Sequence, residues 1–250
     1  RGRDPDPQSG ERAGADADPP WIAKARAFTA PPPWQGLPPP PPVTFYDGFE
    51  HTDVGSRPSR AYSRVEGKGD NIEVTEETAA TGKRSLKITD APGLEHGFNP
   101  HFSYAPNHRE GITTFSFDVR MEQGAELSLE WRQQPGKPHY YIGPKLLFRN
   151  GKLTFADQPP LPLPLGVWTH IEISAGFGSK TDGTWQLTVT TPGAEPKHFS
   201  GLKFVNPETR SVTWLGFISV ANCKGVYYID NVKLETDFVE EARALGADVK

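Results

Sequence analysis

An all-β fold of antiparallel sheets packed face to face is the class that this sequence predicts, and two observations carry the prediction. The first strand-like run, 43–50, and the last, 225–234, are both alternating segments rich in β-branched and aromatic residues. Turn signals recur between them at roughly the 8 to 12 residue spacing that the short strands of a sandwich require. We therefore expect both ends of the domain to meet in one β-sandwich, with acidic residues from each end close together.

The composition supports one packed domain and excludes several functional classes. The chain has 250 residues, of which 35% are hydrophobic and 11% aromatic, enough for a single large sandwich. A net charge of −4 gives no basic face for nucleic acid. No apolar stretch approaches the roughly 20 residues that span a bilayer. The single cysteine, Cys223, excludes an internal disulfide and a cysteine-based metal site.

The proline content divides the chain. Residues 1–42 hold 12 of the 26 prolines, and because proline withholds a backbone donor and stiffens the chain, we expect a largely irregular, disordered linker there. The β-sandwich domain is expected over 43–236, followed by a short C-terminal helix or tail over 237–250. The chain starts at Arg1 without a methionine or a signal peptide, as an excised piece of a larger chain would.

The clearest hairpin is predicted between 115–121 and 127–132, because both runs alternate cleanly around a turn at Gln123-Gly124. Alternation assigns one face of this hairpin to the core. The other face would gather the polar side chains of Ser116, Asp118, Arg120, Ser128, Glu130 and Arg132. This patch is either the floor of a sugar groove or a solvated surface on which opposite charges pair across strands.

Further strands are expected along the rest of the chain. They are 72–74, 83–89, 145–148, 153–155, 167–174, 185–191, 197–199, 212–220 and 226–234. Three tryptophans on these strands, Trp168, Trp185 and Trp214, are interpreted as core residues.

Several short motifs resemble the framework of jelly-roll, concanavalin A-like carbohydrate-binding modules. They are Phe49-Glu50, the run Ala-Thr-Gly-Lys-Arg-Ser-Leu-Lys-Ile at 80–88 and the run Tyr-Ile-Asp-Asn-Val-Lys-Leu at 228–234. The segments 141–146, 151–153 and 165–173 look like domains appended to large exported bacterial proteins that handle polysaccharides. The resemblance covers about 43–234. It implies a jelly-roll sandwich, a secreted protein (extracellular, cell-surface or periplasmic), and other domains in a larger parent chain.

The resemblance also implies a calcium ion, which in such modules often ties the first strand to the last. The matching positions are Glu50 and Asp230, with Asp47 and Asp90 as looser candidates. Calcium takes carboxylate and carbonyl oxygens, which suits acids gathered at a terminal seam. The alternative is that Asp47 and Asp230 only make turn hydrogen bonds.

Sugar binding requires flat apolar rings edged by hydrogen-bonding groups. The candidates for stacking are Phe102, Tyr140 and Tyr141, and those for polar contacts are Arg120, Glu130, Arg132 and His139. Phe98, His101 and Tyr104, which share the irregular segment of Phe102, are further candidates for ligand contacts. In the alternative interpretation, Phe98, Phe102 and Tyr104 cover the end of the core.

A non-catalytic polysaccharide-binding module is the function that the sequence favours. The closely alternating acids of related glycoside hydrolases, Glu-x-Asp-x-x-Glu, are absent, and the flanking arginines would keep Asp118 and Glu130 ionised. An enzyme of the same fold, a polysaccharide lyase or a glycoside hydrolase, is the alternative. For a lyase, Tyr141, His139 and Arg132 supply a base and a carboxylate-neutralising cation within ten residues. A structural or protein-interaction domain is the third possibility.

Overall fold

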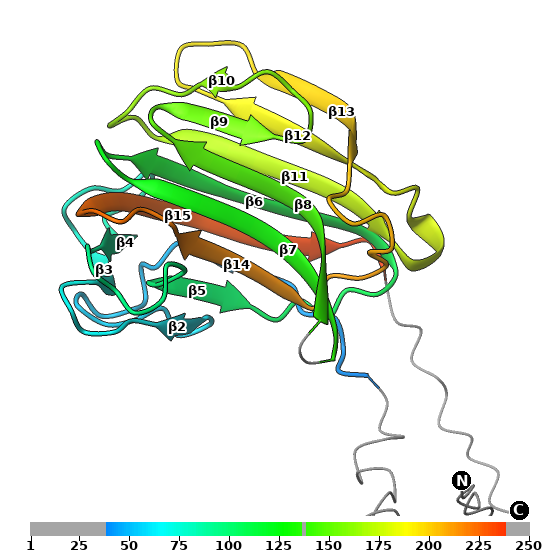
Figure 1. Ribbon diagram of the computed structural model, residues 1–250, viewed down its shortest axis with the longest axis horizontal. Helices are drawn as coiled ribbons and strands as arrows, with labels where there is room; N and C mark the ends of the chain where they lie inside the picture. The colour runs from blue at the N-terminus through cyan, green and yellow to red at the C-terminus, as the bar shows by residue number, and fades with distance from the viewer. Residues whose placement is uncertain (1–38, 137–138, 239–250) are drawn as a thin grey trace, which may run out of the picture. The chain divides into compact units, whose positions relative to one another are not determined.

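Two antiparallel sheets stack face to face in the computed structural model, which describes residues 39–136 and 139–238 (Figure 1). The strands extend from Phe45 to Thr236, and the prediction of an all-β sandwich is confirmed. Most of the proline-rich segment 1–42 and most of the tail 237–250, with its expected short helix, lie outside the described residues.

The larger sheet has eight strands and joins the two ends of the domain. Its order is β13 (Lys197–Lys203), β12 (Thr184–Thr190), β11 (Thr169–Phe177), β6 (Gly111–Met121), β15 (Gly225–Thr236), β4 (Ser85–Asp90) and β3 (Asn71–Thr75), and β1 (Phe45–Asp47) also pairs with β15. Phe45 lies opposite Leu234, and Asp47 lies opposite Val232. The first strand therefore pairs with the last, as the matching sequence runs predict.

The smaller sheet has seven strands and carries the candidate site. Its order is β10 (Leu161–Pro162), β9 (Lys152–Phe155), β8 (His139–Arg149), β7 (Glu126–Gly136), β14 (Trp214–Ser219), β5 (His101–Tyr104) and β2 (Tyr62–Arg64). A short 3₁₀ helix, η1 (Gly178–Lys180), is the one helix in the described part of the chain. No helix within 39–136 and 139–238 is long and apolar enough to cross a membrane.

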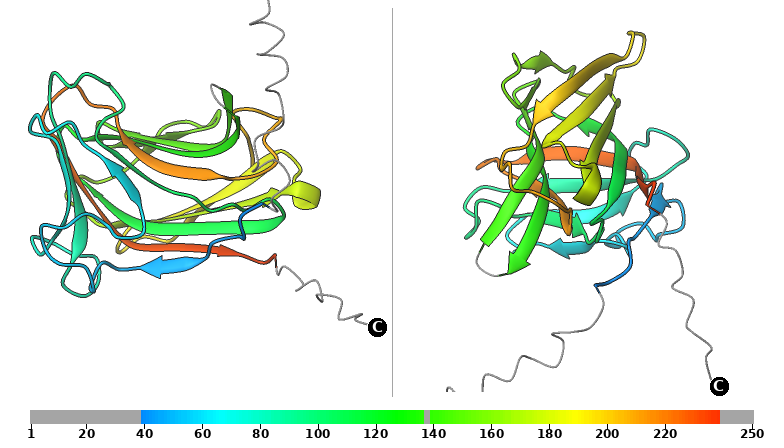
Figure 2. Two further views of the ribbon diagram at one scale, coloured as in Figure 1. Left: turned by 90° about the horizontal axis from the view of Figure 1, so that it is seen from below. Right: turned by 90° about the vertical axis from the view of Figure 1, so that its right-hand side faces the viewer.

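The predicted hairpin between 115–121 and 127–132 is wrong. The strand β6 pairs with β11 and β15 in the larger sheet, whereas β7 pairs with β8 and β14 in the smaller sheet. The turn between them carries the chain from one layer to the other, as the edge-on view shows (Figure 2). Alternation assigned the inward faces correctly, because Phe115 and Trp131 meet across the core with ring centroids 6.2 Å apart. It cannot say whether two such strands are neighbours in one sheet or face each other across the core.

Aromatic side chains fill the space between the sheets. Phe217 stacks on Phe102 with centroids 4.6 Å apart and meets Phe117 edge-on at 5.0 Å. Each buried phenylalanine contributes about 1.5–3 kcal/mol by leaving water. Trp185 is buried as predicted, but Trp168 and Trp214 are only partly buried. The core therefore draws on both sheets, and one tryptophan assigned to it, Trp214, lies in the groove described next.

Candidate functional site

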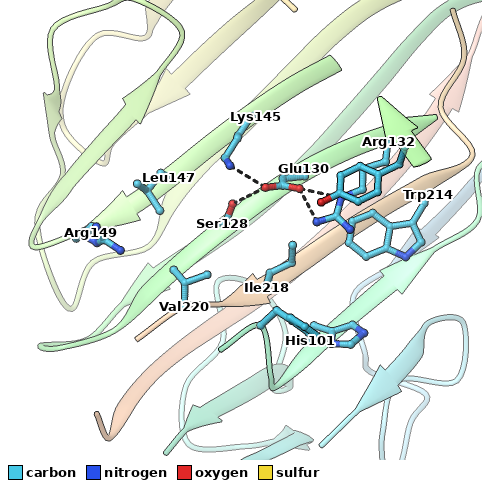
Figure 3. A pocket seen from close by; sticks show the side chains of 12 residues that line it. His101, Ser128, Glu130, Arg132, Lys145, Leu147, Arg149, Trp214, Ile218 and Val220 are labelled. Atoms are coloured by element: carbon cyan, nitrogen blue, oxygen red, sulfur yellow. Dashed lines mark hydrogen bonds and ion pairs between the residues drawn. The ribbon is translucent and has the colours of Figure 1, made fainter. Parts of the chain in front are cut away.

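A groove with a volume of about 630 Å³ lies on the outer face of the smaller sheet (Figure 3). Strands β5, β7, β8 and β14 provide most of its lining. The lining residues are Phe98, His101, Ser128, Glu130, Arg132, Tyr140, Lys145, Leu147, Arg149, Trp214, Ile218 and Val220. This volume lies within the range of small-molecule binding sites, roughly 300–1,000 Å³.

Period-two alternation on β7 separates the groove from the core. Leu129 and Trp131 point inward and are buried, so Ser128, Glu130 and Arg132 project outward along the groove floor. The same rule on β14 buries Leu215 and Phe217 and leaves the intervening residues on the groove side. The floor is thus rigid, because the residues that alternate with it are packed in the core.

A bulge in β8 brings two more side chains to the groove. Glu130 pairs with Lys145, but Arg132 pairs with Ile142, so two residues of β8 stand opposite one of β7. The extra residue shifts the alternation of β8 by one position. As a result, Tyr140 and Lys145, which are five positions apart, both line the groove.

Arg132 is enclosed by two aromatic rings. Its guanidinium carbon lies 4.3 Å from the ring centroid of Tyr140 and 4.3 Å from that of Trp214. The indole of Trp214 itself lies over Gly216, where an added Cβ would come within 2.0 Å of the ring. Only glycine at 216 leaves space for this arrangement. The stack of Gly216, Trp214, Arg132 and Tyr140 fixes a cation on the groove floor through cation–π contacts.

Glu130 connects Arg132 to a second cation. Its carboxylate lies 2.6 Å from Nη2 of Arg132 and 2.8 Å from Nζ of Lys145, as Figure 3 shows. Burial would raise the pKa of the Glu130 carboxyl, but the hydrogen bond from Lys145 and the charge of Arg132 outweigh burial and hold that pKa below its usual value. Glu130 is therefore ionised at neutral pH and unsuited to general acid work. Two cations around one carboxylate leave this part of the floor with a net positive charge.

His101 lies at another side of the groove, in a defined tautomer. Asn99 donates from Nδ2 to Glu66 over 2.8 Å, so its oxygen faces Nδ1 of His101 at 2.9 Å. Nδ1 must therefore carry the proton, which leaves Nε2 as an acceptor. Burial lowers the pKa of His101, and the imidazole is neutral at pH 7.

No protein-family model matches the chain, and no curated protein is similar to it in sequence. Solved structures do match. They include an endo-β-1,4-glucuronan lyase from the fungus Trichoderma reesei (14% identity, TM-score 0.54, 78% of this chain and 95% of that chain), a PL-14 alginate lyase from Aplysia kurodai (15%, 0.50, 73% and 97%) and the cellulose induced protein Cip1 (15%, 0.55, 78% and 98%). The chain shares the β-sandwich fold of these proteins. At such low identity the similarity shows the fold alone.

Five of the ten predicted glycan contacts, Phe98, His101, Glu130, Arg132 and Tyr140, line the groove. Three others lie elsewhere in the sandwich. Tyr104 is buried in the core. Arg120 is on β6 in the larger sheet, where Nε donates to Glu122 over 2.7 Å. Phe102 is fully buried in the core, so it cannot stack on a sugar ring. Arg120 was misplaced because the expected hairpin does not form, and Phe102 because the strand β5 was taken for an irregular loop.

The three residues predicted for a lyase are not brought together in the groove. Arg132 lines it, but Tyr141 and His139 do not, although both lie on β8. Tyr141 is on the same strand as Tyr140 and one position away, and neighbouring residues on a strand project to opposite faces. A lyase built on Tyr141, His139 and Arg132 is therefore not supported by this arrangement.

Two groove residues were missed as ligand contacts in the sequence, namely Lys145 and Trp214. Each alternates with buried apolar neighbours, and this was the signal that could have found them. Trp214 precedes Leu215, for example, and Lys145 precedes Leu146. The cross-strand partners that place both on one face belong to distant parts of the chain and leave no local signal.

The residues predicted to bind calcium lie at the seam between the ends of the domain. Oε1 of Glu50 accepts the amides of Lys83 and Arg84, and Oδ2 of Asp230 accepts those of Ala80 and Thr81. Oδ1 of Asp47 accepts the amide of Phe49. Within 39–136 and 139–238, no group of three or more His, Cys, Asp or Glu is arranged to hold a metal. Each of these three acids accepts backbone amide hydrogen bonds, and calcium binding stays a prediction.

Proposed function

We propose that the groove binds an acidic polysaccharide without cleaving it and holds a sugar carboxylate at Arg132 and Lys145. The observation that carries this proposal is the net positive floor around Glu130 in a chain whose net charge is −4. Arginine and lysine bind carboxylates through charge-assisted hydrogen bonds. Tyr140, which stacks on Arg132 and is 46% exposed, adds flat apolar surface of the kind that sugar rings contact.

The similar solved structures support this choice of ligand class. Two of them are named as acting on glucuronan and alginate, both acidic polysaccharides, and a third is another alginate lyase, Aly36B (12% identity, TM-score 0.54). A binding groove on the same fold would recognise the same chemical feature, a carboxylate on each sugar unit.

A polysaccharide lyase is the second candidate, and the neutral His101 favours it. Nε2 of His101 could accept the proton on the carbon next to the carboxylate, while Arg132 and Lys145 neutralise the charge that develops on the carboxylate oxygens. The electrons left on that carbon would form a double bond as the neighbouring glycosidic C–O bond breaks. The departing sugar oxygen would then take a proton from water.

Glycan binding by two arginine variants tests the proposal. Arg132→Ala should weaken retention of polyglucuronate or alginate at least tenfold, because the carboxylate loses its fixed cation. Arg120→Ala is the matched control, since Arg120 carries the same charge on the other sheet. Equal effects of the two substitutions, or retention of neutral glycans instead, would contradict the proposal.

The same samples separate binding from cleavage. Glycan retention without release of unsaturated uronates supports the binding module. Release of such products that is abolished by His101→Ala would establish the lyase instead. If no glycan is retained while a protein partner is retained, the protein-interaction domain is supported instead.

A further inference from the structure

We propose that Phe98, Tyr62 and His101 form a second sugar subsite, which extends the groove beyond Arg132 and Lys145. This inference rests on the proposed function and specifies how long a stretch of polysaccharide the chain holds. Phe98 and His101 line the groove together with Arg132, so one glycan chain lying in the groove contacts both regions. The subsite takes the C–H face of a sugar ring.

Two large aromatic side chains are exposed side by side with His101. Phe98 is 50% exposed and Tyr62 is 61% exposed. Both surround His101, whose ring centroid lies 6.0 Å from that of Phe98 and 6.2 Å from that of Tyr62. Neither ring is required to fill the core, which is closed beneath them by Phe102 and Tyr104. Exposed apolar surface next to a groove is typical of a ligand contact.

A carboxylate holds the loop that presents Phe98. Oε2 of Glu66 accepts the amide of Glu95 over 2.7 Å, and Oε1 accepts the amide of His96 over 3.0 Å and Nδ2 of Asn99 over 2.8 Å. These bonds, led by that of Asn99, hold the pKa of Glu66 at about 2, and the carboxylate therefore stays ionised at every pH used for binding. The backbone around Phe98 is fixed before any ligand arrives, which lowers the entropy cost of binding.

The ring of His96 stacks on the exposed ring of Phe98. Their centroids lie 5.0 Å apart, and their planes are only 5° from parallel. This contact fixes the orientation of the Phe98 ring, which can then meet the C–H face of a sugar with its own flat face. Nε2 of His101, left without a proton by the Asn99 hydrogen bond, can accept a hydroxyl at the edge of the same sugar. An aromatic face with a hydrogen-bond acceptor beside it matches a pyranose ring, which has an apolar C–H face and hydroxyl groups at its edge.

Binding of defined oligouronates tests the subsite. Isothermal titration calorimetry of the full chain with a disaccharide and a hexasaccharide should give tighter binding of the hexasaccharide. Phe98→Ala and Tyr62→Ala should each weaken hexasaccharide binding about tenfold and leave disaccharide binding within twofold, because the short ligand is held by Arg132 and Lys145 alone. Phe98→Trp should restore hexasaccharide binding.

Tyr46→Ala is the matched control. Tyr46 is 57% exposed and lies on the short strand β1 of the other sheet, so its removal should not change hexasaccharide binding. If Phe98→Ala binds the hexasaccharide like the unchanged chain, the subsite is overturned while the proposed function stands. If the unchanged chain binds neither oligosaccharide, both proposals fail. Melting temperatures of the variants should match that of the unchanged chain, since both side chains are exposed.

Discussion

The guanidinium of Arg132 is immobilised from three directions. Tyr140 and Trp214 cover its two flat faces at 4.3 Å, and Glu130 accepts from its edge at Nε over 2.8 Å. Arginine normally loses about 2 kcal/mol of side-chain entropy when it is fixed. Here this cost is met during folding, so the ligand does not have to meet it. The surrounding residues therefore matter as much for affinity as the charge itself.

Gly216→Ala tests this dependence without touching a charged group. The added Cβ would come within 2.0 Å of the Trp214 indole, so the ring must move and release Arg132. We expect acidic glycans to bind roughly tenfold more weakly, together with a change in tryptophan fluorescence. With a diuronate as the ligand, which does not reach the loop of Phe98, Gly97→Ala is the matched control, because a Cβ at Gly97 meets nothing within 4 Å. If the tryptophan fluorescence changes but the affinity for acidic glycans does not, the stack does not preorganise Arg132.

Single residues of the groove were predictable where a strand was recognised. Glu130 and Arg132 follow from alternation with Leu129 and Trp131, whatever strands lie beside β7. Phe102 was predicted to be an exposed loop residue because Pro100 and the surrounding polar residues suggested a loop. As a strand, His101–Tyr104 alternates cleanly, with Phe102 and Tyr104 buried and His101 towards the groove. The error came from the secondary-structure assignment, and the periodicity itself was informative.

At the scale of whole strands, pairing is what the sequence does not specify. The strand β14 lies between β7 and β5, although some 80 to 110 residues separate it from them along the chain. Hydrogen bonds between such strands form through the backbone, which is nearly the same for every residue. The inward and outward faces are encoded locally, but neighbours within a sheet are chosen by the packing of the whole core. This explains why the hairpin prediction failed while the assignment of core residues on β6 and β7 held.

His108 binds the segment around Val43, where the chain enters the sandwich, to the rest of the domain. Its Nε2 donates to the carbonyl of Val43 over 2.8 Å, its Nδ1 accepts from the Thr113 hydroxyl over 2.9 Å, and its backbone forms a bridge with Val212. The side chain is 1% exposed. Burial lowers the pKa of His108 below its usual value. Below about pH 6.5 His108 is protonated in the unfolded chain but stays neutral in the folded chain. Its contribution to the free energy of unfolding therefore falls as the pH falls.

His108→Gln should therefore have a pH-dependent effect on stability. At pH 8 the variant should be less stable by about 1–2 kcal/mol, because a buried hydrogen-bonded pair is disrupted. The deficit should shrink as the pH is lowered to 5, since only the unchanged chain loses stability through this group. Urea unfolding of both proteins across this pH range measures the difference in their free energies of unfolding. The contributions of titratable groups that the two proteins share cancel in this difference. A deficit that is constant with pH would contradict the neutral, buried state of His108, and the exposed His198→Gln should change stability by less than about 0.5 kcal/mol.

Over the whole molecule, charge is divided between the two sheet surfaces. The chain carries a net charge of −4, yet the groove gathers Arg132 and Lys145 around the buried carboxylate of Glu130, and Arg149, which pairs with Glu126, also lines it. The outer side of the larger sheet instead pairs its charges, for example Arg120 with Glu122 at 2.7 Å and Lys87 with Glu77. A distant polyanion is repelled by the net charge and attracted only where it can reach the groove. Composition alone predicted the absence of a broad basic surface but not this local positive site.

This division of charge predicts a shallow salt dependence for glycan binding. A protein that covers six to ten phosphates of DNA with basic residues loses about 10³–10⁵ in affinity between 50 and 200 mM salt. Only two or three cations act in the groove, and salt also screens the repulsion from the net negative charge. We therefore expect binding of polyglucuronate to weaken by about tenfold or less over the same range, as measured by calorimetry. A loss of a thousandfold would mean that the glycan is held by an extended basic surface, and the assignment of binding to the groove cations would be wrong.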